Sequence, residues 1–476
     1  MKCIKGIMLA SLLLLAITVA NAKVTLSSIF SDNMVLQQKS TVTFKGKANP
    51  NSNVTVIAGW DNKKIVANSD ADGTWNATVA TPSYGGPYDI SFSDGEKTKL
   101  KDVLIGEVWF LSGQSNMEMP VMGFFGQPVH NSQDYIAKAN PRRNIRLYRQ
   151  PNAWSTTLKG EIVDTKWTIA SSQDVSKFSA VGYFFGDFIE ESLDVPVGLI
   201  QCAWSMSTIE AWMPRSIFES KFTDVKMPDV KEKNFGWTQG TPTLLWNAMV
   251  NPWNGFPVAG VLWYQGEANT TDPQNYKRLF PAMVDEWRAL FGDENLPFFY
   301  AQLAPWCDGG NSETLWADFR QVQTELLSSR NNLGMITLGD CGDSIFIHFP
   351  KKIEVGKRFA YLALNKVYGY ELMSMGPIAK ECVRQAKDNC IWVEFDNGMG
   401  GLVPQNYELQ GFEMVDAKGK VTPVKAKIIN DSNKVKVWGD NVDKCIEVRY
   451  GYHNYYEASL FNNAALPASP FKMSIK

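Results

Sequence analysis

The spacing of apolar residues changes twice along this chain, and this change constrains the fold more than any other feature. From Lys23 to about Asp102, apolar and polar residues alternate in short runs, the pattern of a small antiparallel β-sandwich. Over residues 103–375, continuous apolar strands alternate with amphipathic helices, as in a mainly parallel sheet covered on both faces. Over residues 376–476 the β pattern returns. We therefore expect an α/β domain between two β-sandwich-like domains.

The central segment predicts individual elements. Its expected strands are Val108–Leu111, Val195–Ile200, Val258–Trp263, Pro297–Tyr300 and Leu333–Thr337. Its expected helices are Ala180–Glu191, Tyr276–Phe291 and Glu313–Ser329. Ligands of such domains bind outside the carboxyl ends of the parallel strands. Polar residues directly after these strands are therefore the candidates for a functional site.

Residues 1–22 have the pattern of a signal peptide. Lys2 and Lys5 precede an apolar run, and Ala20-Asn21-Ala22 presents small residues for cleavage before Lys23. The run is short for a membrane span, and a retained anchor is the alternative. We expect export to a periplasm or the exterior, or to a lysosome in a eukaryote, with no membrane attachment after cleavage.

The charge of the chain argues against nucleic acid as a partner. Lys and Arg number 47 against 49 Asp and Glu, which leaves a formal charge of −2. No overall positive field would draw such a chain onto a phosphate backbone. We therefore expect no nucleic-acid partner.

Six cysteines remain after the predicted cleavage: Cys202, Cys307, Cys341, Cys382, Cys390 and Cys445. An even number is compatible with disulfides in an oxidising compartment. Cys382 and Cys390 bracket a short loop and are the first candidate pair, with buried unpaired thiols as the alternative. No Cys or His spacing suggests zinc, so we expect no metal.

Ser115 is the candidate nucleophile. The strand that ends at Leu111 leads into Ser112-Gly113-Gln114-Ser115-Asn116-Met117. A serine in a tight strand-to-helix turn is well placed to attack, and the free N–H groups of a first helical turn can help to hold an oxyanion. The alternative is an ordinary helix N-cap. The segment is not the Gly-x-Ser-x-Gly elbow of α/β-hydrolases.

A serine nucleophile needs a base. The sequence contains three histidines, His130, His348 and His453. His348 follows the strand Leu333–Thr337, and either Asp343 or Asp340 before it can accept the Nδ1 proton. The other two histidines lie in a polar loop and among tyrosines, which is typical of surface or packing residues. His348 is therefore the candidate base.

A third segment follows the strand that ends at Leu262. It reads Trp263-Tyr264-Gln265-Gly266-Glu267-Ala268-Asn269. The Gln265 amide can donate to an oxyanion, unless it is a buried glutamine that satisfies backbone groups. Glu267 is either a brace or an alternative acid. We expect supporting roles for nearby polar residues: Gln114, Asn116, Asn269 and Asp340.

Several ordered blocks resemble the sialate O-acetylesterase (sialic acid-specific 9-O-acetylesterase) family, a branch of the SGNH hydrolases. The blocks are Phe30–Gln37, Gly113–Met117, Phe178–Phe185, Ile209–Pro214, Trp263–Asn269, Ile347-His348 and Leu466–Phe471. The resemblance implies a three-layer α/β/α core with a parallel sheet and β modules at both ends. It also implies that Ser115 and His348 remove O-acetyl groups from a sialic acid substrate, without a cofactor.

The chain departs from the family pattern at two places. Where the family tends to have Trp-Gly-Gly-Thr, this chain has Trp204-Ser205-Met206-Ser207, so an oxyanion N–H near Ser205 or Met206 must come from a residue with a side chain. The SGNH pattern has an acid three residues before the histidine, where this chain has Ile345. The family's own version has the acid five residues before the histidine, which is Asp343 here. The third triad member is therefore Asp343, Asp340 or none, with a backbone carbonyl orienting His348 in the last case.

The leading hypothesis is an acetylesterase that removes O-acetyl groups from sialic acids, with 9-O-acetyl groups favoured. One alternative is an acetylesterase that acts on a plant polysaccharide such as acetyl-xylan. A second alternative is a non-catalytic carbohydrate-binding protein, for which 16 tryptophans supply stacking surfaces.

Overall fold

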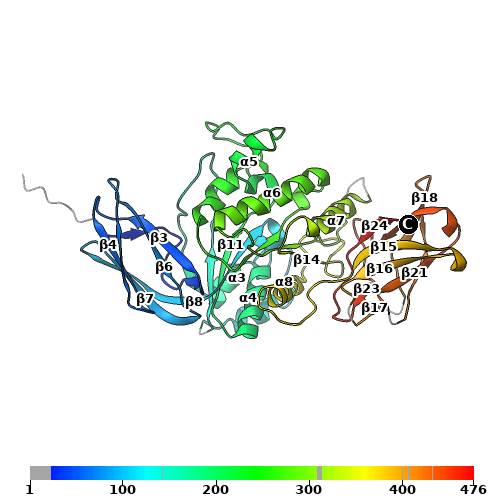
Figure 1. Cartoon of the computed structure of the whole chain (residues 1–476), viewed down its shortest axis with the longest axis horizontal. Helices are drawn as coiled ribbons and strands as arrows, with labels where there is room; N and C mark the ends of the chain where they lie inside the picture. Colours follow the sequence, from blue (N-terminus) through cyan, green and yellow to red (C-terminus); the bar gives the residue numbers. More distant parts are fainter. Residues whose placement is uncertain (1–22, 142, 308–312, 399, 406–407, 431) are drawn as a thin grey trace, which may run out of the picture.

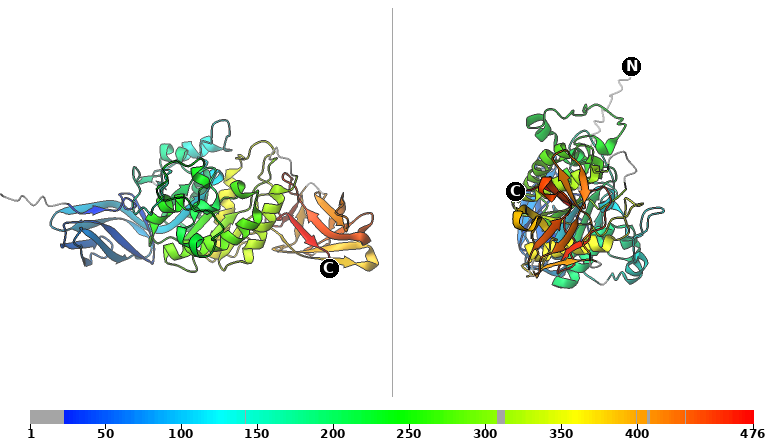
Figure 2. Two further views of the ribbon diagram at one scale, coloured as in Figure 1. Left: turned by 90° about the horizontal axis from the view of Figure 1, so that it is seen from above. Right: turned by 90° about the vertical axis from the view of Figure 1, so that its right-hand side faces the viewer.

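The chain forms three parts in a row, as Figures 1 and 2 show: an amino-terminal β module, a central α/β domain and a carboxyl-terminal β module. The computed structural model describes residues 23–141, 143–307, 313–398, 400–405, 408–430 and 432–476. The predicted signal peptide lies outside the described residues. The α/β prediction is confirmed, since helices and mixed sheets build the centre of the chain.

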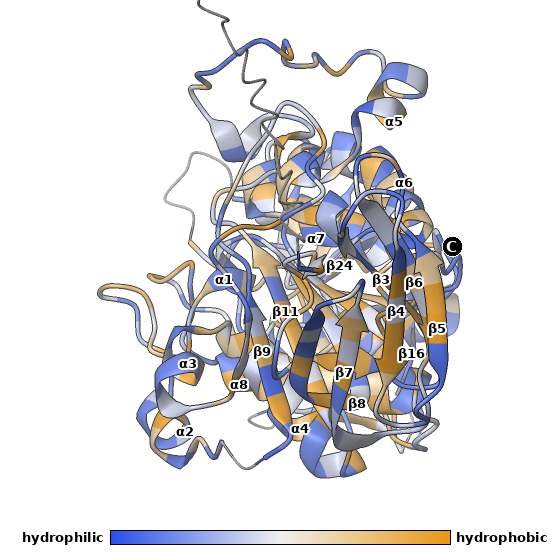
Figure 3. Cartoon of the chain, turned by 90° about the vertical axis from the view of Figure 1, so that its left-hand side faces the viewer, coloured by the Kyte–Doolittle hydropathy of each residue, from blue (hydrophilic) through white to orange (hydrophobic). Residues whose placement is uncertain are grey.

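Two sheets form the amino-terminal module. One contains β1 (Thr25–Leu26), β3 (Thr41–Lys47) and β6 (Thr74–Ala80), and the other β2 (Val35–Gln37), β4 (Asn53–Ala58), β5 (Lys64–Asn68), β7 (Gly85–Ser93) and the start of β8 (Lys97–Gly113). Alternate residues of β6 are buried, among them Trp75. The Trp75 and Phe92 rings pack 5.8 Å apart between the sheets. Figure 3 shows the resulting mixture of hydrophilic and hydrophobic residues along these strands.

Strand β8 belongs to two parts of the molecule. It pairs with β7 and β2 in the amino-terminal module, and its later residues pair with β11 (Val197–Ala203) and β12 (Gly260–Tyr264) in the central sheet. Within the strand Asp102 has a φ of 53°, and its carboxylate lies 3.2 Å from the guanidinium of the buried Arg146. The predicted boundary between residues 102 and 103 therefore falls inside one strand.

The central sheet has the order β10-β9-β11-β8-β12-β13-β14. The edge strand β10 (Trp167–Ile169) is antiparallel to β9 (Ile145–Arg149), and the remaining neighbours, including β13 (Phe298–Ala301) and β14 (Leu333–Ile336), are parallel. Successive residues of β8 face opposite sides. The Trp109 ring packs 5.0 Å from Phe185, whereas Phe110 packs 5.7 Å from Trp287. Both faces are thus covered, which explains why these strands are apolar throughout.

Three helices begin within three residues of the expected starts Ala180, Tyr276 and Glu313, whereas the helix over residues 352–366 was not predicted. Helices α4 (Ala180–Leu193) and α8 (Lys352–Lys366) pack together on one face, and α6 (Pro273–Phe291) lies on the other (Figure 1). The remaining helices are α1 (Ser115–Glu118), α2 (Ser132–Lys138), α3 (Ser172–Lys177), α5 (Arg215–Ser220) and α7 (Leu315–Glu325). Among the described residues, no helix combines the length and the apolar composition needed to cross a bilayer.

The carboxyl-terminal module has its own apolar core. Its strands are β15 (Ile378–Gln385), β16 (Cys390–Asp396), β21 (Lys434–Trp438) and β20 (Lys425–Ile428) in one sheet, β19 (Val421–Pro423), β18 (Phe412–Asp416), β22 (Cys445–Tyr450) and β24 (Phe471–Ser474) in a second, and β17 (Leu402–Pro404) with β23 (Leu460–Asn462) in a third. The amino-terminal module, by contrast, shares one continuous apolar core with the central domain.

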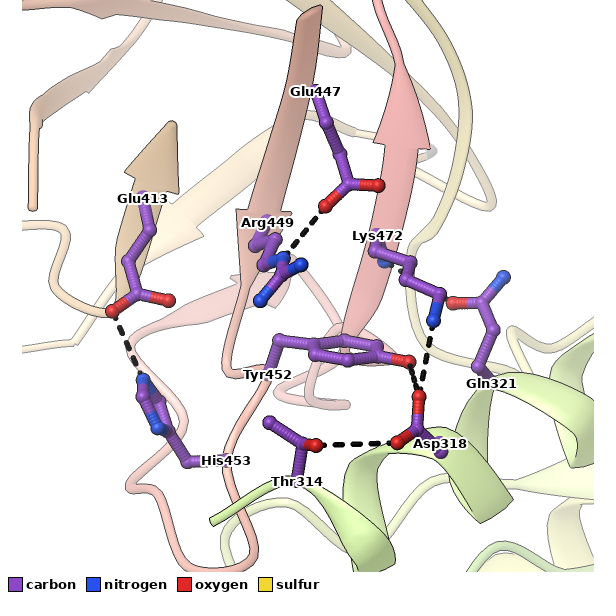
Figure 4. Close-up of polar contacts among 9 residues, drawn as sticks. All are labelled: Thr314, Asp318, Gln321, Glu413, Glu447, Arg449, Tyr452, His453 and Lys472. Carbon is purple, nitrogen blue, oxygen red and sulfur yellow. Dashed lines mark hydrogen bonds and ion pairs between the residues drawn. The ribbon is translucent and has the colours of Figure 1, made fainter. Parts of the chain in front are cut away.

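Polar contacts join helix α7 to the carboxyl-terminal module, as Figure 4 shows. Asp318 accepts hydrogen bonds from the Tyr452 hydroxyl at 2.6 Å and from the Lys472 ammonium at 3.0 Å. Arg320, which is fully buried, donates to the backbone carbonyls of His453 and Asn454. His453 therefore has a structural role: its backbone accepts from Arg320, and its ring nitrogen Nε2 contacts Glu413 in the same module.

The expected Cys382–Cys390 disulfide is absent, and all six described cysteines are unpaired. Cys382 lies opposite Val393 on the neighbouring strand, and Cys390 lies opposite Gln385, so the two thiols sit on different rungs of the ladder. Five of the six cysteines are buried, and burial raises the pKa of Cys202 and Cys341. The alternative of buried unpaired thiols therefore describes five of the six cysteines, and Cys307 is exposed.

Candidate active site

Gly113 makes the turn that presents Ser115. Its φ is 134°, and a Cβ there would lie 2.0 Å from the Tyr264 carbonyl oxygen of β12. Only glycine tolerates both that conformation and that approach. Strand β8 therefore ends abruptly, and Ser115 begins helix α1 at the carboxyl edge of the sheet. The N–H groups of Ser115 and Asn116 make no hydrogen bond within the part of the chain that is described.

His348 is held by a glutamine. Its Nδ1 lies 2.7 Å from Oε1 of Gln127, and the edge of the Phe124 ring packs against the imidazole at 5.1 Å between centroids. An amide oxygen only accepts, so Nδ1 carries the proton and Nε2 is the free base. Burial, together with the positive charge of Lys352, lowers the pKa of His348 to about 4. The imidazole is therefore neutral at neutral pH.

The backbone of His348 is tied to the turn that carries Ser115. The Asn116 amide nitrogen donates to the Ile347 carbonyl at 3.2 Å, so the residue after Ser115 bonds the residue before His348. The segment around Gln127 is tied to the same loop, because the His130 N–H donates to the Pro350 carbonyl at 2.9 Å. Within the described contacts no hydrogen bond joins the Ser115 hydroxyl to the imidazole. The observed contact between the two loops runs through their neighbours, Asn116 and Ile347.

Neither candidate acid contacts His348, which corrects the expectation for Asp343 and Asp340. Asp343 accepts the N–H groups of Ile345 at 2.8 Å and Phe346 at 3.0 Å and so stabilises its own loop. Asp340 forms two hydrogen bonds, of 2.7 and 2.6 Å, with the buried guanidinium of Arg358. Asp343 therefore stabilises its own turn, and Asp340 neutralises a buried guanidinium. The partner of His348 is Gln127, which comes from a distant loop.

Gln265 is a brace in this structure, contrary to the expectation of an oxyanion donor. Its side chain is fully buried, and its Nε2 donates to the Ser207 carbonyl at 3.0 Å and to Oδ1 of Asn269 at 2.7 Å. Gln114 plays a similar part, because its Oε1 accepts the N–H groups of Gly266 at 3.3 Å and Ala268 at 3.2 Å. Gln114 thus connects the end of β8 to the loop after β12, and Gln265 connects the end of β12 to the loop after β11.

The loop that departs from the family pattern has a strained residue. Met206 has a φ of 62°, a region that favours glycine, and its side chain is exposed. The Ser205 N–H, expected at the oxyanion, instead donates to the Glu118 carboxylate at 2.6 Å. This corrects the expectation for Ser205. The Met206 N–H makes no hydrogen bond with any described residue.

Two residues of this site were missed from the sequence, Gln127 and Lys352. Lys352 is the first residue of α8 and is fully buried beside Asn116. Gln127 is 221 positions from His348 in the chain, so no local pattern joins them. Lys352 follows Lys351 in a polar segment that reads as surface. The sequence offered one signal of a role for Lys352 at the site, which is that it lies four residues after His348. No group of three or more His, Cys, Asp and Glu able to hold a metal occurs in the described ranges.

Comparison with known proteins places these residues in context. A family described as "Carbohydrate esterase, sialic acid-specific acetylesterase" matches residues 105–365. The human sialate O-acetylesterase is 26% identical over 94% of this chain and 91% of its own length, and the mouse enzyme 24% identical over 94% and 93%. A crystal structure of a carbohydrate acetylesterase from Xanthomonas citri is 32% identical, with a TM-score of 0.85 over 94% of this chain and 99% of that one.

Proposed function

The chain belongs to the sialic acid-specific acetylesterase family of carbohydrate esterases, and from this premise we propose that it removes O-acetyl groups from sialic acids, 9-O-acetyl groups in particular. The family match, which includes Ser115 and His348, is the observation that carries the proposal. Membership makes the protein a carboxylic ester hydrolase, so the non-catalytic alternative no longer applies. The proposed core is the three-layer SGNH type, consistent with helices on both faces of the sheet.

Ser115 is the proposed nucleophile and His348 the proposed base. With Nδ1 engaged by Gln127, the lone pair of Nε2 is available to accept the Ser115 hydroxyl proton. Ser115 Oγ then attacks the acetyl carbonyl, and His348 returns the proton to the sugar oxygen as the acetyl-serine forms. Water repeats these steps and releases acetate. Gln127 replaces the expected aspartate as the group that orients the imidazole.

The oxyanion of the tetrahedral intermediate needs donors whose hydrogen bonds are not already used. The N–H groups of Ser115 and Met206 meet this condition among the described residues, whereas Gln265 and the N–H of Ser205 do not. We assign the oxyanion to Ser115 and Met206. Removal of one such donor typically costs about 10²–10³ in rate.

A plant polysaccharide such as acetyl-xylan is the second candidate substrate. The Xanthomonas citri relative, at 32% identity, is described only as a carbohydrate acetylesterase, without a named sugar. Initial rates of acetate release from acetyl-xylan and from 9-O-acetylated sialic acid separate the two candidates. We also propose export, through cleavage of residues 1–22, to a periplasm or the exterior, or to a lysosome in a eukaryote.

Acetate release from 9-O-acetylated sialic acid tests the mechanism. Ser115→Ala and His348→Ala proteins that remain folded should lose nearly all turnover, since nucleophile and base act as a unit. A fluorophosphonate reagent should label Ser115 in the wild type and leave Ser115→Ala unlabelled. Wild-type rates in either variant would refute the assignment of these two residues.

A further inference from the structure

We propose that Lys352 is a positioning residue of the esterase reaction: its buried ammonium orients the Asn116 amide and thereby holds the Ser115 turn against the backbone of His348. This inference rests on the proposed function of Ser115 and His348. Among the described contacts Lys352 hydrogen-bonds neither the nucleophile nor the base, and it acts through Asn116.

Lys352 is buried without an ion-pair partner. It has no exposed surface, its Nζ donates to Oδ1 of Asn116, and no carboxylate of a described residue lies within ion-pair distance. Its ammonium sits over the Phe349 ring at 3.7 Å and the Tyr264 ring at 5.9 Å from the centroids. Aromatic faces recover only part of the cost of removing a charge from water. A lysine in this position is therefore poorly explained by stability alone.

The ammonium fixes which way the Asn116 amide points. Lysine has only donors, so the atom of Asn116 that faces it must be the oxygen. The Asn116 amide nitrogen then donates to Oε1 of Glu267 at 2.6 Å and to the Ile347 carbonyl at 3.2 Å. The last of these bonds joins the two catalytic loops. Without Lys352 the buried Asn116 oxygen loses its donor, and only the two acceptors Glu267 and Ile347 still hold the amide in the orientation that makes this connection.

The charge of Lys352 also acts on His348. Five residues surround the ammonium: Asn116, Glu267, Cys341, Tyr264 and Phe349. Burial lowers the pKa of Lys352 to about 7, with opposing contributions from Glu267 and Cys341. Below that pH Lys352 is mostly charged and disfavours the imidazolium form of His348, whose described side-chain contacts are with Gln127 and Phe124. Loss of the lysine charge therefore raises the pKa of His348.

Replacement of Lys352 by methionine tests the proposal, with Lys351→Met as the matched control. Lys351 is exposed and donates to the Asp340 carbonyl. In folded Lys352→Met we expect kcat for acetyl ester hydrolysis to fall about 10–100-fold, because catalytic groups lose their alignment. We also expect the acidic limb of the kcat/KM profile to move to higher pH. Lys351→Met should change neither.

Lys352→Gln separates the orientation of the Asn116 amide from the effect of the lysine charge. It also replaces Lys352→Met in the test if the methionine variant does not fold. Its amide can still donate to Asn116, so kcat should stay nearer to the wild type, whereas the acidic limb should shift as it does in Lys352→Met. Wild-type kcat together with a wild-type acidic limb in the folded variants would refute the role of Lys352. The rate of Ser115→Ala distinguishes the failures: if it equals the wild-type rate, the proposed function is wrong and the role of Lys352 falls with it.

Discussion

His348 and Gln127 lie 2.7 Å apart, ring nitrogen Nδ1 to amide oxygen Oε1, so a neutral group occupies the place that a carboxylate has in a Ser-His-Asp triad. A carboxylate would stabilise the imidazolium that forms when serine is deprotonated. An amide fixes the tautomer but adds no charge. The proposed base is therefore oriented without being made more basic.

The first prediction concerns Gln127. Gln127→Ala should lower kcat/KM about tenfold, the equivalent of about one neutral hydrogen bond. Gln127→Glu should raise the pKa of His348, because an adjacent negative charge favours the imidazolium. The acidic limb of the kcat/KM profile of Gln127→Glu should then move to higher pH. Gln133→Glu, the same change at an exposed position of α2, is the control and should match the wild type.

The second prediction concerns the wild-type pH profile. The kcat/KM profile reports the base of the free enzyme. Because the pKa of His348 is lowered to about 4, activity should fall only near that pH and not near the 6.5 of an unperturbed histidine. Hydrolysis of an acetyl ester between pH 3 and 8 checks this. A limb near 6.5 would show that the imidazole is better solvated than the structure indicates.

The third prediction separates Gln127 from the acid expected from the sequence. Asp343→Asn keeps an oxygen that can accept the N–H groups of Ile345 and Phe346, so the loop should keep its shape. Since Asp343 does not contact His348, kcat/KM should stay within about threefold of the wild type, less than the effect of one hydrogen bond. A loss of two orders of magnitude or more would restore Asp343 as the triad acid.

The fourth prediction concerns stability. Asp340→Ala leaves the buried guanidinium of Arg358 without its carboxylate, which should lower the free energy of unfolding by about 3–5 kcal/mol. Asp285→Ala removes the carboxylate from an exposed pair with Arg330 and should cost less than about 1 kcal/mol. Urea denaturation of both variants measures the difference. Equal losses would mean that the Asp340–Arg358 pair is effectively solvated.

The sequence predicts where the functional loops lie better than it predicts what each side chain bonds. Ser115 and Gln265 both follow buried strands at the expected edge, because strand ends can be read from local patterns. The bonds of Gln265 depend on Ser207 and Asn269, which only the fold brings near. The partner of His348 is a loop glutamine, and amides carry no sequence signal comparable to that of a carboxylate before a histidine.

Strand β8 carries a consequence for the mechanics of the molecule. One unbroken backbone runs from the pairing with β7 to the glycine before the nucleophile, and the apolar interior is continuous along it. No linker separates the two modules at this strand, so the amino-terminal part and the turn that presents Ser115 share one strand and one apolar core. The amino-terminal module is thus continuous with the strand that presents the proposed nucleophile, and a chain cut at residue 103 would leave that strand without its pairing to β7 and β2.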